Sequence, residues 1–456
     1  MSGVAWLAAL LLLPLAAGTP LLTHPAFGWL SFASRVVLSG ASGAVLLSFA
    51  MTACVLLGIP WSVPALTVAA ALLAWGLRAL MPPGAAEPIH HEPLGTAGLA
   101  AHTLAFLSVL AALAAARSGA ASSADLLFFW GPKAQQFALA RTFDEAFMRD
   151  AFHGYMHSYY PPLLTNLWAF ASIAAGRFVW TSAVLTFPIL LAALAVGLPG
   201  ILRASLGRRG AAVTSALIVA AIGLIGMEAD IGGNGDMPLL AFETLAMALL
   251  LSPAAARRPT VLLAGLLLAG AASTKVEALP FVLAAAVLFA VLRRDPGRRP
   301  AWKVITLLLA PTVLSLAAWF VFGATRGLFR GYSEHGTFLD LHPDHFPVVV
   351  EAIARALAGT AWGLPWLIPL ACVAAAARQI TRREWLPLGV AATVAGFLLF
   401  TSIHRAEDPS QWISWSAARV FSPVAMLVAL AVMPERRRNP RAPGEGPPRH
   451  ATAATP

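Results

Sequence analysis

The chain has 456 residues, of which 59% are hydrophobic and only 11% are charged. Because soluble domains carry about a quarter charged residues, this composition excludes an ordinary soluble protein and predicts an integral membrane protein. A formal net charge of +10 is also found in nucleic-acid-binding proteins, but basic cytoplasmic loops between membrane helices produce the same total. We therefore expect membrane lipids, and no nucleic acid, as partners.

Apolar runs long enough to cross a bilayer recur along the whole sequence. A spanning helix needs about 20 mainly apolar residues, and fewer where its neighbours enclose it. This criterion predicts an all-α transmembrane bundle of about 13 spans, within a range of 11–14. The expected spans are 4–22, 37–58, 61–81, 95–116, 178–202, 211–227, 237–252, 260–273, 279–293, 303–323, 359–377, 385–402 and 417–433. No Lys or Arg precedes the first run, which favours a retained helix over a cleaved signal peptide.

Basic residues between the expected spans indicate the orientation of the chain. With thirteen spans, the basic segments 203–209, 257–258, 293–299, 378–383 and 436–438 all fall on one side. Basic loops favour the cytoplasm, so we expect the amino terminus outside and the carboxyl terminus inside. The basic segments fall on one side only if the apolar stretch at 161–175 does not cross the membrane. We interpret that stretch as a juxtamembrane or re-entrant helix.

This topology divides the chain into three parts. Residues 1–94 form N-terminal membrane helices, and residues 95–433 form the main helical module. The module carries two long outer loops, at 117–160 and 324–358. The tail at 434–456 is rich in Arg, Pro and Gly, a composition typical of disordered segments.

The first outer loop combines aromatic side chains with isolated charges. Its distinctive residues are Asp125, Trp130, Lys133, His157, Tyr159 and Tyr160. Between Lys133 and His157, the spacing of Phe137, Ala140, Phe143 and Phe147 predicts an amphipathic helix that lies in the plane of the membrane interface. Asp125 follows two serines and would also serve as a helix cap. Lys133 would also extend toward lipid headgroups.

Two shorter outer segments contain paired charges. The turn at 228–239 holds Asp230 and Asp236 with three glycines, and we interpret it as a solvated turn in preference to a cation site. Lys275 and Glu277 are two positions apart, a spacing that a helix does not present on one face. A mutual ion pair and a functional role are therefore equally open for these two residues.

The remaining outer segments carry histidine and arginine. The segment 325–360 contains several His and Asp residues but no His-x-x-x-His pair, which favours a solvated loop over a metal site. The last segment begins with His404 and Arg405 and continues to Arg419. Its tryptophans are typical of an interfacial belt. The two arginines suit a planar, bidentate contact with phosphate.

Taken in order, these segments resemble the GT-C superfamily of membrane glycosyltransferases, which use polyprenyl-phosphate-linked sugars. The superfamily includes protein O-mannosyltransferases, the aminoarabinose transferases of lipid A and lipopolysaccharide-modifying enzymes. The resemblance covers residues 100–300. It is carried by Asp125 with Phe129-Trp130 and Lys133, by Tyr159-Tyr160-Pro161-Pro162, by Asp236-Met-Pro-Leu239 and by Thr274-Lys275-Val-Glu277 before Pro280.

The resemblance implies transfer of a sugar from a polyprenyl-phosphate donor to a hydroxyl group of a glycan, lipid or protein acceptor. It implies that Asp125 is the catalytic carboxylate and that Lys275 lies near the donor phosphate. Arg405 and Arg419 are further candidates for that phosphate. The expected lining residues are Trp130, Lys133, His157, Tyr159, Tyr160, Asp230, Asp236, Glu277 and His404.

One departure from the family pattern concerns the second carboxylate. Many members carry two adjacent acids where this chain has Asp125-Leu126, so the second acid would come from Asp236 or Asp230. A divalent cation, Mg²⁺ or Mn²⁺, at Asp125 and Asp236 is left open. The resemblance implies a bacterial inner-membrane protein whose site faces the periplasm or exterior.

Two other functional classes are compatible with the sequence. A transporter or lipid flippase would place ionisable residues near mid-membrane. Most ionisable residues here lie at the expected outer rim, and Glu243 is the main exception. A non-catalytic relative that only binds lipid-linked sugar is the third hypothesis.

Overall fold

The computed structural model describes residues 2–82, 93–119, 123–149, 159–229, 231–293, 300–328, 342–376, 385–403 and 409–431. Within these ranges the chain is helical and contains no β-strand. Seven helices of the described part are long and apolar enough to cross a membrane. The protein is therefore an all-α membrane protein, as its composition predicts. The expected disordered tail at 434–456 lies outside the described residues.

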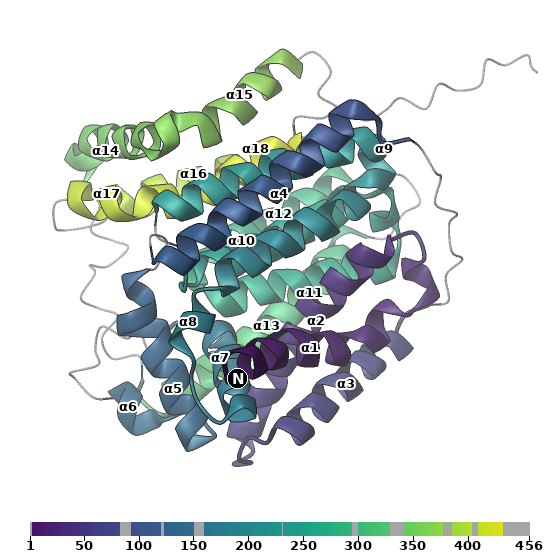
Figure 1. The fold of residues 1–456 in the computed structure, drawn as a ribbon, viewed down its shortest axis with the longest axis vertical. Coiled ribbons are helices and arrows are strands. Elements are labelled where there is room, and N and C mark those ends of the chain that lie inside the picture. The colour runs from purple at the N-terminus through teal and green to yellow at the C-terminus, as the bar shows by residue number, and fades with distance from the viewer. Residues whose placement is uncertain are drawn as a thin grey trace, which may run out of the picture.

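The N-terminal helices form one side of the bundle (Figure 1). These are α1 (Ser2–Leu22), α2 (Phe32–Leu56) and α3 (Val63–Ala79), whereas α4 (Gly95–Ser118) lies apart from them and packs against the helices of residues 186–228. Small residues bring α1 and α2 together, because a Cβ atom on Gly43 would lie only 1.8 Å from the carbonyl oxygen of Pro14. Such close backbone contact is a usual basis of helix association in membranes.

Helix α9 (Thr186–Glu228) is a hairpin of two antiparallel helices. Its chain reverses at Gly207, whose φ of 69° and ψ of 175° are non-helical. The reversal brings Gly223 beside Leu191 and Gly226 beside Phe187. Two helices thus occupy the region where the sequence predicts separate spans at 178–202 and 211–227.

The centre of the bundle is α10 (Asp236–Leu251), in which all 16 residues are buried. It contacts α9, α11 (Arg258–Thr274), α12 (Leu279–Leu292) and α18 (Ser422–Ala431), while α13 (Ala301–Thr325) packs on α11 and α16 (Trp385–Ile403) packs on α12 and α18. Helices α14 (Phe346–Gly359), α15 (Leu364–Ala376) and α17 (Pro409–Val420) cover one edge of these helices (Figure 1).

Short helices gather at one end of the bundle, which we call the polar end. They are α5 (Gly131–Ala140), α6 (Glu145–Arg149), α7 (Leu163–Ala175) and α8 (Trp180–Ala183). Both ends of α7 lie there, since Tyr160 bonds to Glu277 and Arg177 bonds to Ser2. The juxtamembrane or re-entrant placement of 161–175 stays a prediction.

The single amphipathic helix expected around Phe137–Phe147 is wrong. Helix α5 ends at Ala140, Arg141 takes a left-handed conformation with φ 52°, and α6 begins only at Glu145. The break lets Phe137 and Phe143 both pack edge-on against Trp61, with ring centroids 6.3 and 5.6 Å away. Burial of both rings against the bundle replaces the expected contact with the interface.

Candidate functional site

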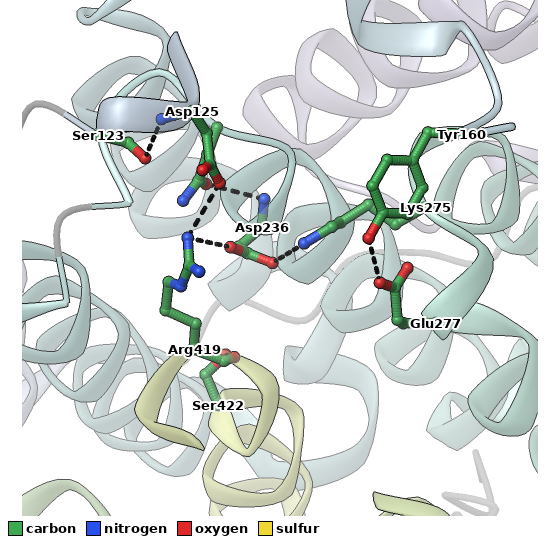
Figure 2. Close-up of polar contacts among 9 residues, drawn as sticks. Ser123, Asp125, Tyr160, Asp236, Lys275, Glu277, Arg419 and Ser422 are labelled. Carbon is green, nitrogen blue, oxygen red and sulfur yellow. Dashed lines mark hydrogen bonds and ion pairs between the residues drawn. The ribbon is translucent and has the colours of Figure 1, made fainter. Parts of the chain in front are cut away.

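Four segments that are distant in sequence meet at the polar end (Figure 2). Asp125 immediately precedes η2 (Leu126–Trp130), a π-helical turn. Asp236 is the first residue of α10, and Lys275 lies between α11 and η5 (Val276–Ala278). Arg419 is in the last turn of α17. Single-turn π-helices are frequent at functional sites, so the π-helical turn next to Asp125 favours a functional site at this junction.

Charges of alternating sign connect these four side chains. The Arg419 Nη1 donates to Asp125 Oδ2 at 3.0 Å and lies 3.7 Å from Asp236 Oδ2. The Lys275 Nζ donates to Asp236 Oδ1 at 2.7 Å. We call Asp125, Arg419, Asp236 and Lys275 the charge cluster.

Asp125 does not cap a helix, so that interpretation of the sequence is wrong. The side chain of Ser123 does so instead, with its Oγ accepting the backbone N–H of Asp125 at 3.1 Å. The backbone N–H of Ser123 donates in turn to the carbonyl of Gly232 at 2.8 Å. The Asp125 carboxylate is therefore directed to Arg419.

The turn before α10 is packed, and the interpretation of Asp236 as part of a solvated turn is wrong. Asp236 is only 3% exposed and its backbone N–H donates to Asn234 Oδ1 at 2.9 Å. Gly233 has a φ of 85°, and a Cβ atom there would lie 2.9 Å from Leu126. The glycine thus allows the turn to approach η2.

An aromatic group borders the charge cluster. The Tyr160 hydroxyl donates to Glu277 Oε1 at 2.5 Å, and its ring stacks on Trp130 with centroids 5.6 Å apart. The Lys275 Nζ lies 5.8 Å from the centroid of the same tyrosine ring. Desolvation, followed by the charge of Glu277, raises the pKa of Tyr160. Glu277 therefore has a partner other than Lys275, and their mutual ion pair is not formed.

Lys133 is buried in α5, and its expected extension toward lipid headgroups is wrong. It is 1% exposed, and its Nζ lies 5.7 Å from the centroid of the Trp319 ring. The Trp319 Nε1 donates to the carbonyl of Tyr159 at 3.0 Å. Burial lowers the pKa of Lys133 to about 7.

A narrow cavity of about 20 Å³ lies next to the charge cluster. Its charged lining residues are Asp236, Glu243, Lys275, Glu277 and Arg419. Its apolar walls come from α10, α12, α16 and α18. The cavity thus combines apolar walls with charged groups at its edge, and as it stands it has room for about one or two water molecules.

The donor set does not fit the expected Mg²⁺ or Mn²⁺ ion at Asp125 and Asp236. Arg419 faces both carboxylates, and Lys275 binds the second one, so their charges are already compensated. In the described part of the chain, no three His, Cys, Asp or Glu side chains form a metal-binding group. Hard divalent cations prefer several oxygen ligands without competing cations.

No protein-family model matches this chain, and no curated protein or solved structure is significantly similar to it. The geometry of the residues therefore carries the functional argument.

The structure brings together four of the residues that the sequence singles out as catalytic, phosphate-binding or lining residues. These are Asp125, Asp236, Lys275 and Arg419, with Trp130, Tyr160 and Glu277 at their side. Four other candidates, His157, Asp230, His404 and Arg405, lie outside the described residues. Sequence reasoning missed Ser123 and Asn234, whose types are common in any turn. It noted Glu243, the only acid inside the apolar run of α10 after Asp236, but not its place in the cavity.

Proposed function

We propose that this protein is a membrane glycosyltransferase of the GT-C type. It would transfer a sugar from a polyprenyl-phosphate donor to a hydroxyl group of a glycan, lipid or protein acceptor. The observation that carries the proposal is the charge cluster beside a largely apolar cavity. The cluster supplies both a carboxylate base and two cations for a phosphate.

The reaction requires one proton transfer and one displacement. Asp125 would accept the proton of the acceptor hydroxyl group, whose oxygen then forms a bond to the anomeric carbon. The bond from that carbon to the phosphate oxygen breaks, and polyprenyl phosphate leaves. Attack opposite the leaving group inverts the anomeric configuration. A positioned carboxylate base contributes about 10²- to 10⁴-fold to such a rate.

Two cations of the cluster suit the departing phosphate. Lys275 and Arg419 are held in place by Asp236 before any ligand arrives, so their charges need little reorganisation during the reaction. The guanidinium of Arg419 presents its donors in a plane, which matches phosphate oxygens. Because Arg419 also contacts Asp125, the base and the leaving group would lie on neighbouring sides of one site.

The reaction would take place on the outer side of the membrane. Basic segments fall on the side opposite the charge cluster in the expected topology, which supports an active site facing the periplasm or exterior of a bacterial inner membrane. Membrane lipids would surround the helices and the polyprenyl chain of the donor. This arrangement explains why an enzyme for a lipid-bound sugar would be built almost wholly from apolar helices.

Asp125→Asn tests the proposal with a minimal change of shape. We expect the variant to bind donor but to lose sugar transfer by at least about 10²-fold. The purified protein would be assayed in nanodiscs with polyprenyl-phosphate sugars and extracted envelope acceptors, after its thermal stability has been compared with wild type. Glu351→Gln is the matched control, because Glu351 is an exposed acid paired with Arg355 one helical turn away. Full activity of Asp125→Asn would end the assignment.

The donor and acceptor would be identified in cells. Mass spectrometry of envelope glycans and glycolipids, with and without the gene, should reveal one sugar that disappears. Restoration by wild type but not by Asp125→Asn would connect the loss to the charge cluster. An unchanged glycan and glycolipid profile would contradict the proposal.

Transport is the second candidate function, and Glu243 is the observation that favours it. This acid is 1% exposed within α10 and lines the cavity. Ionisable groups at such positions mark the pathways of many transporters. Uptake or lipid scrambling by reconstituted protein, lost in Glu243→Gln and kept in Asp125→Asn, would support transport over transfer. Donor binding without turnover would instead support a non-catalytic relative.

A further inference from the structure

Two arginines at the end of the bundle opposite the polar end carry buried nitrogen atoms without a partner. Arg35 is the fourth residue of α2, and Arg203 lies in the first half of the α9 hairpin. In the described part of the chain, the Arg35 Nε and the Arg203 Nη2 are buried and form no hydrogen bond. Buried polar atoms are nearly always hydrogen-bonded, and a guanidinium group does not lose its proton in proteins, so these two atoms call for a ligand.

Both arginines lie far from the charge cluster. The carboxyl-terminal end of α2 meets the polar end, because the backbone N–H of Trp61 donates to the Arg141 carbonyl at 2.8 Å. Helix α2 has 25 residues, so its first turn lies about 35 Å from that contact. The α9 hairpin starts directly after α8, at the polar end, and reverses at Gly207 on the other side. In the expected topology this other side faces the cytoplasm.

The two arginines border the junction at which α2 packs on α9. A Cβ atom on Gly200 would lie only 2.2 Å from Ser31 Oγ, so the two helices touch at these residues. Arg35 is four positions after Ser31 and therefore lies on the same side of the chain as it enters α2. Arg203 is three positions after Gly200 and lies on the same face of α9. Both guanidinium groups thus belong to one helix junction.

No acidic side chain of the described residues compensates these two cations. Residues 2–82 contain no Asp or Glu, and α9 contains none before Glu228 at its far end. Residues 244–276 also contain none, and they pass the same end of the bundle, where Ser205 donates to the Leu251 carbonyl at 3.1 Å. The positive end of the α2 dipole adds to the unfavourable position of Arg35. An anion from outside the chain would balance these charges.

The surroundings of the junction favour an anion that the membrane supplies. Phe32, the first residue of α2, is 76% exposed, and Val196, one turn before Gly200, is 57% exposed. In a membrane protein such apolar side chains face acyl chains. Planar guanidinium groups match the oxygens of a phosphate group. A phospholipid provides both parts, and basic pockets between membrane helices are common sites for anionic lipids.

We propose that Arg35 and Arg203 bind the phosphate group of an anionic phospholipid at the junction of α2 and α9. The lipid belongs to the leaflet opposite the charge cluster. It connects the start of α2 to the first half of the α9 hairpin and thereby stabilises the folded protein. This site is separate from the charge cluster and does not depend on the proposed glycosyltransferase function.

Lipid binding to the purified full-length protein in detergent tests the proposal. Dioleoyl phosphatidylglycerol and dioleoyl phosphatidylcholine have the same acyl chains and a phosphate group, but choline adds a cation that cancels the phosphate charge. Native mass spectrometry measures the apparent affinity for the first lipid bound. We expect wild type to prefer phosphatidylglycerol by about tenfold or more. The double variant Arg35→Gln with Arg203→Gln should reduce this preference to within about twofold.

Two other double variants separate a defined site from general attraction. Arg208→Gln with Arg209→Gln is the matched control, because it removes the same charge from exposed residues near the same hairpin turn, and it should keep most of the preference. Arg35→Lys with Arg203→Lys retains the charges without the planar donors and should show an intermediate preference. Thermal unfolding without added lipid shows that each variant is folded. The lysine variant carries the comparison where the glutamine variant does not fold.

Three results would overturn the inference. Equal affinities of wild type for the two lipids would exclude an anionic-lipid site. Equal losses of preference in the two glutamine variants would show diffuse attraction to the basic turn. Inorganic phosphate that competes with phosphatidylglycerol at equal concentration would show that the arginines take free phosphate instead of a lipid. Each of these results would leave the glycosyltransferase proposal to its own test with Asp125→Asn.

Discussion

Arg419 donates a hydrogen bond of 3.0 Å to Asp125, although 294 positions separate the two residues. The same nitrogen lies 3.7 Å from Asp236. One guanidinium group therefore holds two carboxylates that come from different parts of the chain, and it connects α17 to the start of η2 and of α10. The contact makes the position of α17 a direct determinant of the geometry around Asp125.

Replacement of Arg419 by Lys tests whether the planar guanidinium is needed. A single ammonium group retains the charge but cannot present several fixed donors to Asp125, Asp236 and a phosphate at once. We expect sugar transfer to fall by about 10²-fold or more, measured with purified protein in nanodiscs. Arg355→Lys is the control, because Arg355 is exposed and pairs with Glu351 one helical turn away. Wild-type activity in Arg419→Lys would show that charge alone suffices.

Removal of one partner of the Lys275–Asp236 ion pair should destabilise the folded protein more than removal of both partners. Both side chains are at least nine-tenths buried, so Lys275→Met would leave a buried carboxylate with Arg419 as its only ion-pair partner among the described residues. We expect a loss of about 3–5 kcal/mol in the free energy of unfolding. The double variant Lys275→Met with Asp236→Leu should recover part of this loss. Thermal unfolding in detergent measures both, and strictly additive effects would contradict a coupled pair.

The sequence predicts the positions of the apolar helices well. An apolar run of bilayer length is a local signal, and described helices occur in all thirteen regions, although only seven helices of the described part are long and apolar enough to cross a membrane. The sequence also names Asp125, Asp236, Lys275 and Arg419 as candidates, and the structure brings these four side chains into contact.

The partners of these residues could not be predicted from the sequence. The sequence does not indicate that Arg419 contacts Asp125 and Asp236, because this pairing depends on where α17 lies relative to α10. Lys133 was expected near headgroups, but the bend at Arg141 and the packing of Trp319 enclose it. These outcomes follow from long-range packing, for which hydrophobic periodicity contains no information.

Lys133 should make the stability of the protein depend on pH. Its pKa falls from 10.5 to about 7 on folding because burial disfavours the charged form. Between pH 7 and 10.5 the unfolded chain therefore binds more protons than the folded protein, and stability should rise with pH across this window. Below pH 7 both states are protonated, and the full cost of the buried charge remains.

Replacement of Lys133 by Met should remove this contribution. Thermal unfolding in detergent at several values between pH 6.5 and 10 should show a smaller rise in the variant than in wild type, with the largest stabilisation by Met at the acidic end. Lys303→Met is the control, because Lys303 is exposed at the start of α13 and should leave the profile unchanged. A parallel profile for Lys133→Met and wild type would show that Lys133 is not the titrating group.

The hairpin in α9 depends on a single glycine. Gly207 has a φ of 69° and a ψ of 175°, a combination that residues with a Cβ atom adopt at a cost of about 1–3 kcal/mol. We expect Gly207→Ala to lower thermal stability in detergent by a corresponding amount, and to weaken the packing of Gly223 on Leu191 across the hairpin. Gly40→Ala is the matched control, because Gly40 lies inside α2 with open space around its Cβ position. Alanine there should stabilise the helix by up to about 1 kcal/mol. Equal stability of the two variants would show that the chain reverses at α9 without the backbone conformation of Gly207.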